Sequence, residues 1–260
     1  MVNKKRSRRD RILELVNEKG SITTAELSSH FQVTNETIRK DLHYLDSAGC
    51  IKKTHGGANC IGTLFRELPS LQLEQYRNEK IKIAKSAARF LKNNAVFFID
   101  SGSTASYLAT LLDSFHSITV VTTSMLVANI MQSQGTDNYL YLPSGFVNSQ
   151  AMHIYGRSVE RSLQDFRFTA AFFGSSGIRY HDGPTVLDPQ EIAYKSIVAN
   201  NSEKCVIMCD HSKFSIGGVA QYLSWNKVDY FITDSGATPE NLSTLGSHPQ
   251  IIIENSFYTP

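Results

Sequence analysis

The sequence lacks the features by which several common classes of protein are recognised. It has only four cysteines, at positions 50, 60, 205 and 209, and none of them forms a CxxC pair. Cys205 and Cys209 lie two pleats apart on one face of a predicted strand, which is a poor geometry for two ligands of one zinc ion. We therefore expect reduced, buried thiols of the kind found in cytosolic proteins.

Signals for membrane insertion and secretion are also missing. No apolar stretch approaches the ~20 residues that cross a membrane. The basic N-terminus leads to Ile12 and Leu13, but Glu14 interrupts this short apolar segment, so we expect no signal peptide. The prediction is a cytoplasmic protein with no membrane partner.

Sequence motifs for nucleotide binding, nucleophilic catalysis and metal binding are absent as well. The sequence contains neither the Walker A pattern nor G-x-S-x-G. Its eight histidines are dispersed, and none lies near a cysteine at the spacing of metal ligands. We predict no cofactor, no metal ion and no catalytic residue.

Positive charge, in contrast, is concentrated at one end of the chain. Residues 1–60 hold 11 Lys and Arg against 7 Asp and Glu, whereas residues 61–260 hold 15 against 17. Most of the excess lies in residues 1–11, where Asp10 is the only acid. A basic arm beside a nearly neutral remainder favours a polyanionic partner, although such an arm can also serve only as a solubilising tail.

The segment from Thr34 to Leu45 has the pattern of an amphipathic helix. Ile38, Leu42 and Leu45 recur at the i, i+4, i+7 spacing of a buried stripe, and Thr34 is well placed as the N-cap. The opposite face carries side chains that can donate hydrogen bonds to phosphates or base edges. These side chains are Asn35, Thr37, Arg39, Lys40 and His43, and Thr34 at the start of the helix is a further candidate for DNA contact.

A second short helix is predicted just before this one. It opens with Thr23 and Glu26, which have the spacing of a capping box. Only Gln32 and Val33 separate the two helices, so residues from about 23 to 42 form a predicted helix-turn-helix. Residues 8–19 are predicted as a further helix that completes its small core.

A strand and turn after the helix-turn-helix indicate a basic wing. Residues 51–55 alternate like a strand, and Gly56 with Gly57 supplies the turn. Basic side chains of the arm and the wing would contact phosphates: Arg8, Arg9, Lys52, Lys53 and His55. Residues 1–58 are thus predicted to bind double-stranded operator DNA, and a palindromic operator requires at least a homodimer.

The segments TIRKDL (37–42) and THGGA (54–58), with Leu45 and Gly49 between them, resemble the N-terminal signature of the DeoR-type family of bacterial transcriptional regulators. That family usually has TIRRDL, so Lys40 keeps the charge of an arginine but loses its bidentate geometry. The resemblance covers about residues 6–58 and implies a winged helix-turn-helix.

Residues 59–80 have the mixed composition of a linker, and residues 81–260 show a βαβ rhythm. A helix over 79–93 comes first. Strands are predicted at 95–99, 118–121, 139–142, 169–173, 205–208, 228–233 and 250–253. Helices are predicted at 104–112, 124–134, 157–166 and 189–201. The alternation predicts an α/β domain with a mostly parallel sheet covered on both faces.

The ends of four predicted strands carry small polar or ionisable side chains. Ligands of such folds bind beyond the carboxyl ends of the strands, where hydroxyls and free N–H groups at a helix start can hold an anion. Lys213 would neutralise a phosphate, and Asp100 and Asp210 would accept from sugar hydroxyls; the alternative is a surface lysine and turn-capping aspartates. The candidate effector-binding residues here are Asp100, Ser101, Gly102, Ser103, Thr104, Thr123, Ser124, Gly145, Asp210 and Lys213.

This half also resembles the DeoR-type family, in its C-terminal sensor domain. The matching segments, in the family's order, are DSGST (100–104), VTTS (121–124), SG (144–145), YG (155–156), FGSSGI (173–178) and DHSKF (210–214). The resemblance adds Gly156 to the site. It implies a phosphorylated sugar effector and a fold resembling ribose-5-phosphate isomerase. We expect residues 81–260 also to hold the oligomer together. Two departures stand out, because Thr123 replaces a usual Asn and Ser144 a usual Gly.

Glu191 and Lys195 lie four residues apart on one predicted helix. We expect an exposed i, i+4 ion pair worth ~0.3 kcal/mol; the alternative is that one of the two side chains reaches the effector. The pair is therefore left out of the predicted site.

Two other functions compete with a ligand-controlled repressor of a carbohydrate-use operon. An active sugar-phosphate isomerase would need a carboxylate base near an acid or a lysine. The related isomerases carry an acidic stretch after the equivalent strand, whereas residues 174–178 here read GSSGI and the next acid is Asp182. A purely architectural DNA-binding protein would not account for the polar strand ends.

Overall fold

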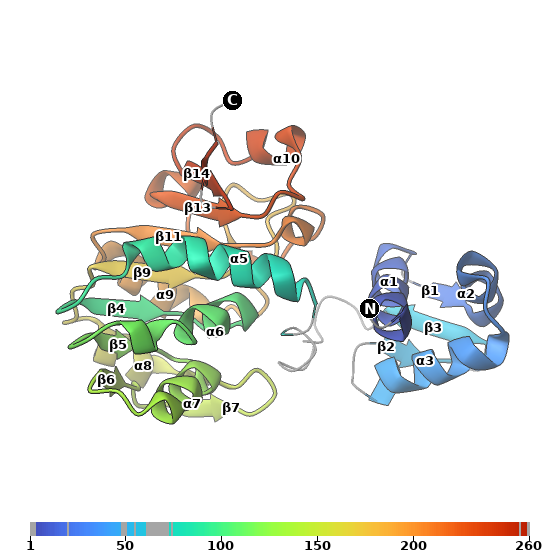
Figure 1. The fold of residues 1–260 in the computed structure, drawn as a ribbon, viewed down its shortest axis with the longest axis horizontal. Helices are drawn as coiled ribbons and strands as arrows, with labels where there is room; N and C mark the ends of the chain where they lie inside the picture. Colours follow the sequence, from blue (N-terminus) through green and yellow to red (C-terminus); the bar gives the residue numbers. More distant parts are fainter. Residues whose placement is uncertain are drawn as a thin grey trace. The chain divides into compact units, whose positions relative to one another are not determined.

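The computed structural model describes residues 4–19, 21–47, 51–54, 56–60, 73, 75–254 and 256–258. The chain divides into two compact units, Met1–Gln75 and Tyr76–Pro260 (Figure 1). The division falls inside the predicted linker 59–80, most of which lies outside the described residues. No helix in the described ranges is long and apolar enough to cross a membrane.

In its described ranges between Lys4 and Cys60, the first unit has three helices and a small antiparallel sheet. In chain order its elements are α1 (Lys4–Lys19), β1 (Ser21–Thr23), α2 (Thr24–Phe31), α3 (Asn35–Ser47), β2 (Ile51–Lys53) and β3 (Gly57–Cys60). The sheet has the order β1-β3-β2, so β1 extends the two-stranded wing that the sequence predicts. The arrangement is a winged helix-turn-helix.

Local signals in the sequence account for the helix boundaries of this unit. Thr23 and Glu26 form the predicted capping box at the start of α2, and the Thr34 hydroxyl accepts from the Thr37 N–H at the start of α3 (3.3 Å). The predicted apolar stripe of α3 is buried against α1, α2 and the sheet. The first helix begins at Lys4 rather than at residue 8.

The second unit is built on an eight-stranded sheet with the order β15-β14-β13-β11-β9-β4-β5-β6. Its strands are β4 (Val96–Ile99), β5 (Thr119–Val121), β6 (Tyr139–Tyr141), β9 (Ala170–Phe173), β11 (Cys205–Met208), β13 (Tyr230–Thr233), β14 (Gln250–Ile253) and β15 (Ser256–Phe257). All neighbouring pairs are parallel except β14 with β15. The carboxyl ends of the parallel strands therefore meet at one edge.

Helices cover both faces of this sheet (Figure 1). Phe97 and Ile99 pack beneath α5 (Arg77–Ala87), α6 (Ser103–Ala109) and α7 (Met125–Gln134). Phe98 points to the other face, beneath α8 (Arg157–Leu163) and α9 (Glu191–Asn200). The predicted fold class is confirmed. Each predicted strand is present within two residues of its expected ends.

Shorter elements were not predicted. A hairpin of β7 (Phe146–Asn148) and β8 (His153–Tyr155) follows β6, and β10 (Thr185–Val186) pairs with β12 (Ala220–Gln221). A short helix, α10 (Pro239–Ser243), precedes β14. Strands of two or three residues are too short to show a periodicity in the sequence. Cys205 and Cys209 are reduced and buried, as expected.

Candidate functional site

The exposed face of α3 presents the side chains predicted to contact DNA. Asn35, Arg39, Lys40 and His43 are all exposed, and Thr37 is half-buried. The side chains of Arg39 and Lys40 are 62% and 71% exposed, and their ion pairs to Glu36 are long, at 4.0 and 3.9 Å. Their charged groups are thus free to move to a phosphate or a base edge.

Arg8 and Arg9 bind a carboxylate that the sequence analysis did not single out. Asp41 is fully buried in α3, and its two oxygens accept from Nε of Arg8 at 2.7 Å and Nε of Arg9 at 2.8 Å. The guanidinium of Arg9 also lies 3.7 Å from the ring centroid of Tyr44. The arginines therefore fix α1 against α3; their predicted contact with phosphates stays a prediction.

The wing is only partly described. Lys53 is exposed, and its backbone N–H donates to Oδ1 of Asp46 at the end of α3 (2.7 Å). This bond ties the wing to α3, the helix that carries the side chains predicted to contact DNA. The side chain of Lys52 and all of His55 lie outside the described residues.

In the second unit, the loops after β4 and β5 begin with buried polar residues. Asp100 is fully buried directly after β4, and its Oδ2 accepts from the Gly174 N–H after β9 at 3.3 Å. Thr123 and Ser124 follow β5 and are buried, and the Ser124 hydroxyl caps α7 by accepting from the Val127 N–H (3.2 Å). The predicted strand-end residues thus lie at one edge of the sheet.

Lys195 and Glu191 are part of this edge, so the predicted surface pair is wrong. Lys195 is 4% and Glu191 6% exposed. The Lys195 ammonium donates to Oδ2 of Asp100 at 2.7 Å and lies 3.1 Å from Oε2 of Glu191. Burial raises the pKa of Asp100. Burial alone would lower the pKa of Lys195, but the charges of Asp100 and Glu191 raise it.

A signal in the sequence pointed to this burial. The buried residues of α9 are Glu191, Tyr194, Lys195 and Val198, which have the i, i+3, i+4, i+7 spacing of an inward stripe. Two charges on an apolar stripe indicate a buried pair rather than an exposed one. The Tyr194 hydroxyl lies 3.5 Å from both Thr123 Oγ1 and Glu191 Oε2, so it joins the loop after β5 to α9.

The loop after β11 holds Asp210 and Lys213 beside a second ion pair. Asp210 caps the turn, accepting from the Ser212 N–H at 3.1 Å, while its other oxygen is buried with no partner among the described residues. Lys213 is half-buried. Nδ1 of His211 lies 2.7 Å from Oδ2 of Asp234 after β13, and the hydrogen bond to Asp234 raises the pKa of His211.

The predicted glycines differ in what their backbones allow. Gly102 and Gly156 have φ of 122° and 116° at the starts of α6 and α8, a region that favours glycine. A Cβ on Gly145 would lie 2.6 Å from the Tyr155 carbonyl oxygen, so this glycine permits close packing against the hairpin. Ser101 and Ser103 are half-buried, and Thr104 is buried.

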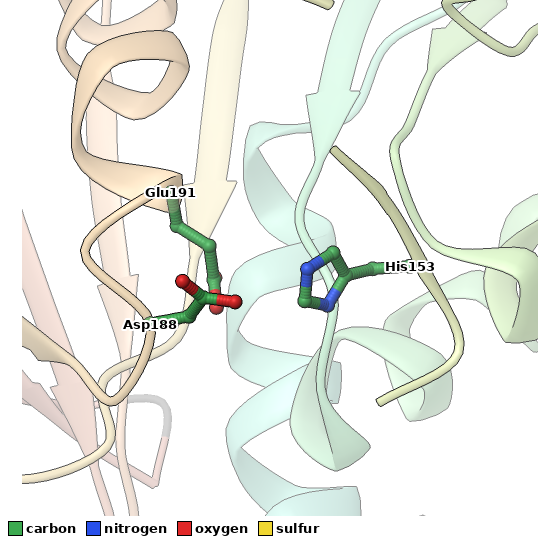
Figure 2. Close-up of side chains that lie close together, drawn as sticks. All are labelled: His153, Asp188 and Glu191. Carbon is green, nitrogen blue, oxygen red and sulfur yellow. The ribbon is translucent and has the colours of Figure 1, made fainter. Parts of the chain in front are cut away.

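A further group of side chains lies between β8 and the start of α9. Ligand atoms of His153, Asp188 and Glu191 all lie within 4.8 Å of one another. The imidazole and the two carboxylates point toward a common space (Figure 2). The histidine–cysteine spacing rule missed this group, because His153 is far from the acids in sequence and no cysteine takes part.

Two family models match the chain: a DeoR-like helix-turn-helix domain over residues 8–63 and a DeoR C-terminal sensor domain over residues 75–235. The glycerol-3-phosphate regulon repressor of Escherichia coli is 30% identical over 94% of this chain and 97% of that protein. The lactose phosphotransferase system repressor of Staphylococcus epidermidis is 28% identical over 89% and 92%. Among solved structures, ribose 5-phosphate isomerase A from Methanocaldococcus jannaschii aligns over 54% of this chain and 55% of that one, with 17% identity and a TM-score of 0.38.

Proposed function

We propose, on the premise that the chain belongs to the DeoR family of transcriptional regulators, that it represses a carbohydrate-use operon in the cytoplasm under the control of a phosphorylated sugar. Relatives that repress a glycerol-3-phosphate regulon and a lactose phosphotransferase system support the carbohydrate link. The winged helix-turn-helix binds operator DNA, and the sensor unit binds the effector.

In the DNA-binding part of the proposal, α3 enters the major groove. The exposed Arg39 and Lys40 reach guanine edges or phosphates, and Lys53 of the wing contacts the backbone. Arg8 and Arg9 act chiefly by holding α1 on α3 through Asp41. Because a palindromic operator takes two such modules, the working species is a homodimer or a larger homo-oligomer.

The observation that carries the effector proposal is the burial of Lys195 between Asp100 and Glu191 at the carboxyl ends of the strands. Removing charged groups from water costs several kcal/mol per ion, and groups with perturbed pKa values gather at functional sites. At this edge of a parallel sheet the charged groups serve a polar ligand. Carboxylates suit sugar hydroxyls, and Lys213 with the start of α6 suits a phosphate.

A thermal-shift panel of sugar phosphates and their unphosphorylated parents tests the effector class. A ligand at 100 times its Kd stabilises the protein by about 2.7 kcal/mol, so one phosphorylated sugar is expected to raise the melting temperature while its parent does not. The Lys213→Ala variant should lose that shift and keep its operator affinity. A panel without any shift, or an equal shift in the variant, would reject the proposed phosphate site.

One observation supports a second candidate function, that of a sugar-phosphate isomerase that carries a DNA-binding unit. The carboxylate of Glu191 lies beside the ammonium of Lys195. Isomerisation needs such a pair of a carboxylate and a lysine, and the segment after β9 has no acid to provide it. We favour binding, because the Lys195 ammonium is already engaged in ion pairs with both Glu191 and Asp100. Turnover of any sugar phosphate that is abolished by Glu191→Gln would favour the enzyme instead.

A further inference from the structure

We propose that His153, Asp188 and Glu191 form a binding site for one divalent cation at the edge of the effector site. No sequence motif indicates a metal here, but the three side chains converge in space. Only the last step of the proposal, contact between the cation and the effector, depends on the proposed function.

The three side chains come from two segments, β8 and the start of α9. His153 opens β8, which pairs with β7 and forms a bridge to Ser124. The Ile154 N–H donates to the Thr123 carbonyl oxygen at 2.8 Å, and the Met125 N–H donates to that of Met152 at 2.9 Å. These bonds fix the histidine against the loop after β5, which is itself part of the effector site.

The geometry of the three ligand atoms fits a metal ion. Nitrogen and oxygen ligands lie about 2.0–2.2 Å from Zn²⁺, so two ligands of one ion are at most about 4.4 Å apart. All three atoms here fall within 4.8 Å of one another. The imidazole and the carboxylates face one another (Figure 2). Small side-chain adjustments would bring all three to coordination distance.

Hydrogen bonds behind the carboxylates orient them, as outer-shell bonds do in metal sites. Oδ1 of Asp188 accepts from the Gln190 N–H at 3.1 Å. Oε2 of Glu191 lies 3.1 Å from the Lys195 ammonium and 3.5 Å from the Tyr194 hydroxyl. The Glu191 N–H donates to the Asp188 carbonyl oxygen at 3.0 Å, which fixes the spacing of the two acids at the start of α9.

The negative charge of this region also favours binding of a cation. Asp100 and Glu191 share the ammonium of Lys195, and Asp188 adds a third carboxylate close to that of Glu191, so negative charge gathers around this lysine. Asp100 is fully buried, and its Oδ1 has no hydrogen-bond partner among the described residues. Excess buried charge is costly, and one divalent cation would balance it.

The ligand set indicates the kind of ion. An imidazole suits zinc, iron and copper, whereas carboxylates suit magnesium, calcium and manganese. One imidazole with two carboxylates therefore fits Zn²⁺ or Mn²⁺ and leaves coordination positions open. Under the proposed function, an oxygen of the effector would take one of these positions, which would let an anion approach a site rich in carboxylates.

Direct titration of the full-length, chelator-treated protein tests the site without any effector. Zn²⁺ binding is followed by calorimetry, and Mn²⁺ binding by loss of the free-ion electron paramagnetic resonance signal. We expect one site per chain and at least tenfold weaker binding in His153→Gln and in Asp188→Asn. The matched control is His116→Gln. The His116 side chain is 71% exposed and lies 3.9 Å from Asp137, and this variant should bind the cation like the wild type.

Each outcome bears on the proposal. The absence of a site, or equal affinity in the wild type and Asp188→Asn, would overturn it and would leave a hydrogen-bonded histidine–carboxylate cluster. Melting curves identify a variant that fails to fold, and Asp188 is only half-buried, so its variant should fold even if that of the buried His153 does not.

The same titration, repeated with sugar phosphates, separates this proposal from the proposed function. If the cation binds but no sugar phosphate shifts the melt with or without it, the metal site stands and the effector class fails. If a sugar phosphate binds equally well in EDTA and in Mn²⁺, the cation has no part in effector binding. If no cation binds while a sugar phosphate does, only the metal site is lost.

Discussion

The ammonium of Lys195 lies 2.7 Å from Oδ2 of Asp100, 95 positions away in the sequence. The bond joins α9 to the end of β4. A second contact, 4.8 Å from the Lys195 ammonium to the ring centroid of Tyr222, encloses the charge further. The Tyr222 hydroxyl in turn donates to the Gly174 carbonyl oxygen at 2.6 Å. The lysine thus connects the loops after β4 and β9 to the helix that covers them.

Replacing Lys195 by methionine is expected to destabilise the sensor unit strongly. The change leaves Asp100 and Glu191 buried without their cation, and breaking one side of a buried pair costs about 3–5 kcal/mol. Denaturant unfolding of the full-length protein measures the difference. The control is Lys227→Met, an exposed lysine of the same unit, which should change stability by less than about 0.5 kcal/mol. A loss of stability no larger than in the control would show that the pair contributes little.

Asp41→Asn should separate α1 from α3 in the DNA-binding unit. The buried carboxylate accepts from both Arg8 and Arg9, so its removal leaves two partly buried guanidinium groups without a counter-ion, at a cost of about 3–5 kcal/mol. Proteolysis and denaturant unfolding of this unit report the change. Glu36→Gln serves as the control, because the ion pairs of Glu36 are long and exposed and should matter little.

Arg39→Ala is expected to reduce operator affinity far more than affinity for unrelated DNA. A bidentate contact between arginine and guanine contributes about 1–3 kcal/mol of discrimination, whereas a phosphate contact contributes equally on every sequence. Lys53→Ala in the wing is the comparison, and it should weaken both DNAs alike. Binding is measured by fluorescence anisotropy at several salt concentrations, and an equal loss on both DNAs for Arg39→Ala would make it a phosphate contact.

The fold was predictable because its elements carry strong periodic signals. The buried strands of the sheet are continuous apolar runs such as VFFI (96–99) and CVIM (205–208), and the helix-turn-helix has its capping residues in place. Parallel topology then brings the strand ends to one edge, so the candidate residues that follow them are placed by the fold itself.

The prediction missed the charged residues that point inward. Asp41 lies on the stripe of Ile38, Leu42 and Leu45, and Lys195 lies on that of Tyr194 and Val198, but a charge suggests an exposed position in any rule based on hydropathy. Each charge is buried because it pairs with a residue distant in the sequence: Asp41 pairs with Arg8, and Lys195 pairs with Asp100. His153 was missed because its neighbours, Asp188 and Glu191, are likewise distant in the sequence.

The pair of His211 and Asp234 should make stability depend on pH. The hydrogen bond to Asp234 raises the pKa of His211 above its usual 6.5. Burial acts to raise the pKa of Asp234, but its bonds to His211 and Gly236 bring it below 3.8. The stabilisation is therefore full between about pH 4 and 6.5; it is lost as pH rises through the raised pKa of His211 and as pH falls through the lowered pKa of Asp234.

Denaturant unfolding of the wild type and His211→Gln across this range tests the sign. The variant should be less stable at pH 5.5, and the difference should shrink as pH rises and the wild-type histidine loses its proton. In His116→Gln, which removes an exposed histidine, the difference should be small throughout. A gap that widens toward high pH would show that the neutral histidine, rather than the charged pair, stabilises the fold.

Tyr76 contacts the loop after β11 at the point where the sensor unit begins. It is the first residue of the sensor unit, and its ring meets that of His211 edge-on at 4.9 Å, one residue from Asp210. Its backbone is left-handed, with φ 47° and ψ 39°, a conformation that costs about 1–3 kcal/mol outside glycine. We expect the contact with His211 to favour this conformation, and an effector that moves the loop after β11 to release it.

Tyr76→Ala is therefore expected to uncouple the two activities while preserving each. Effector binding, followed by thermal shift, and operator affinity without effector should stay near wild type, whereas the change in operator affinity on adding effector, typically 1–3 kcal/mol, should fall toward zero. Linkage requires the operator's effect on effector affinity to vanish equally. Tyr180→Ala, which alters a tyrosine that is 86% exposed, should keep the full coupling. Full coupling in Tyr76→Ala, or the loss of effector binding itself, would rule out coupling through Tyr76.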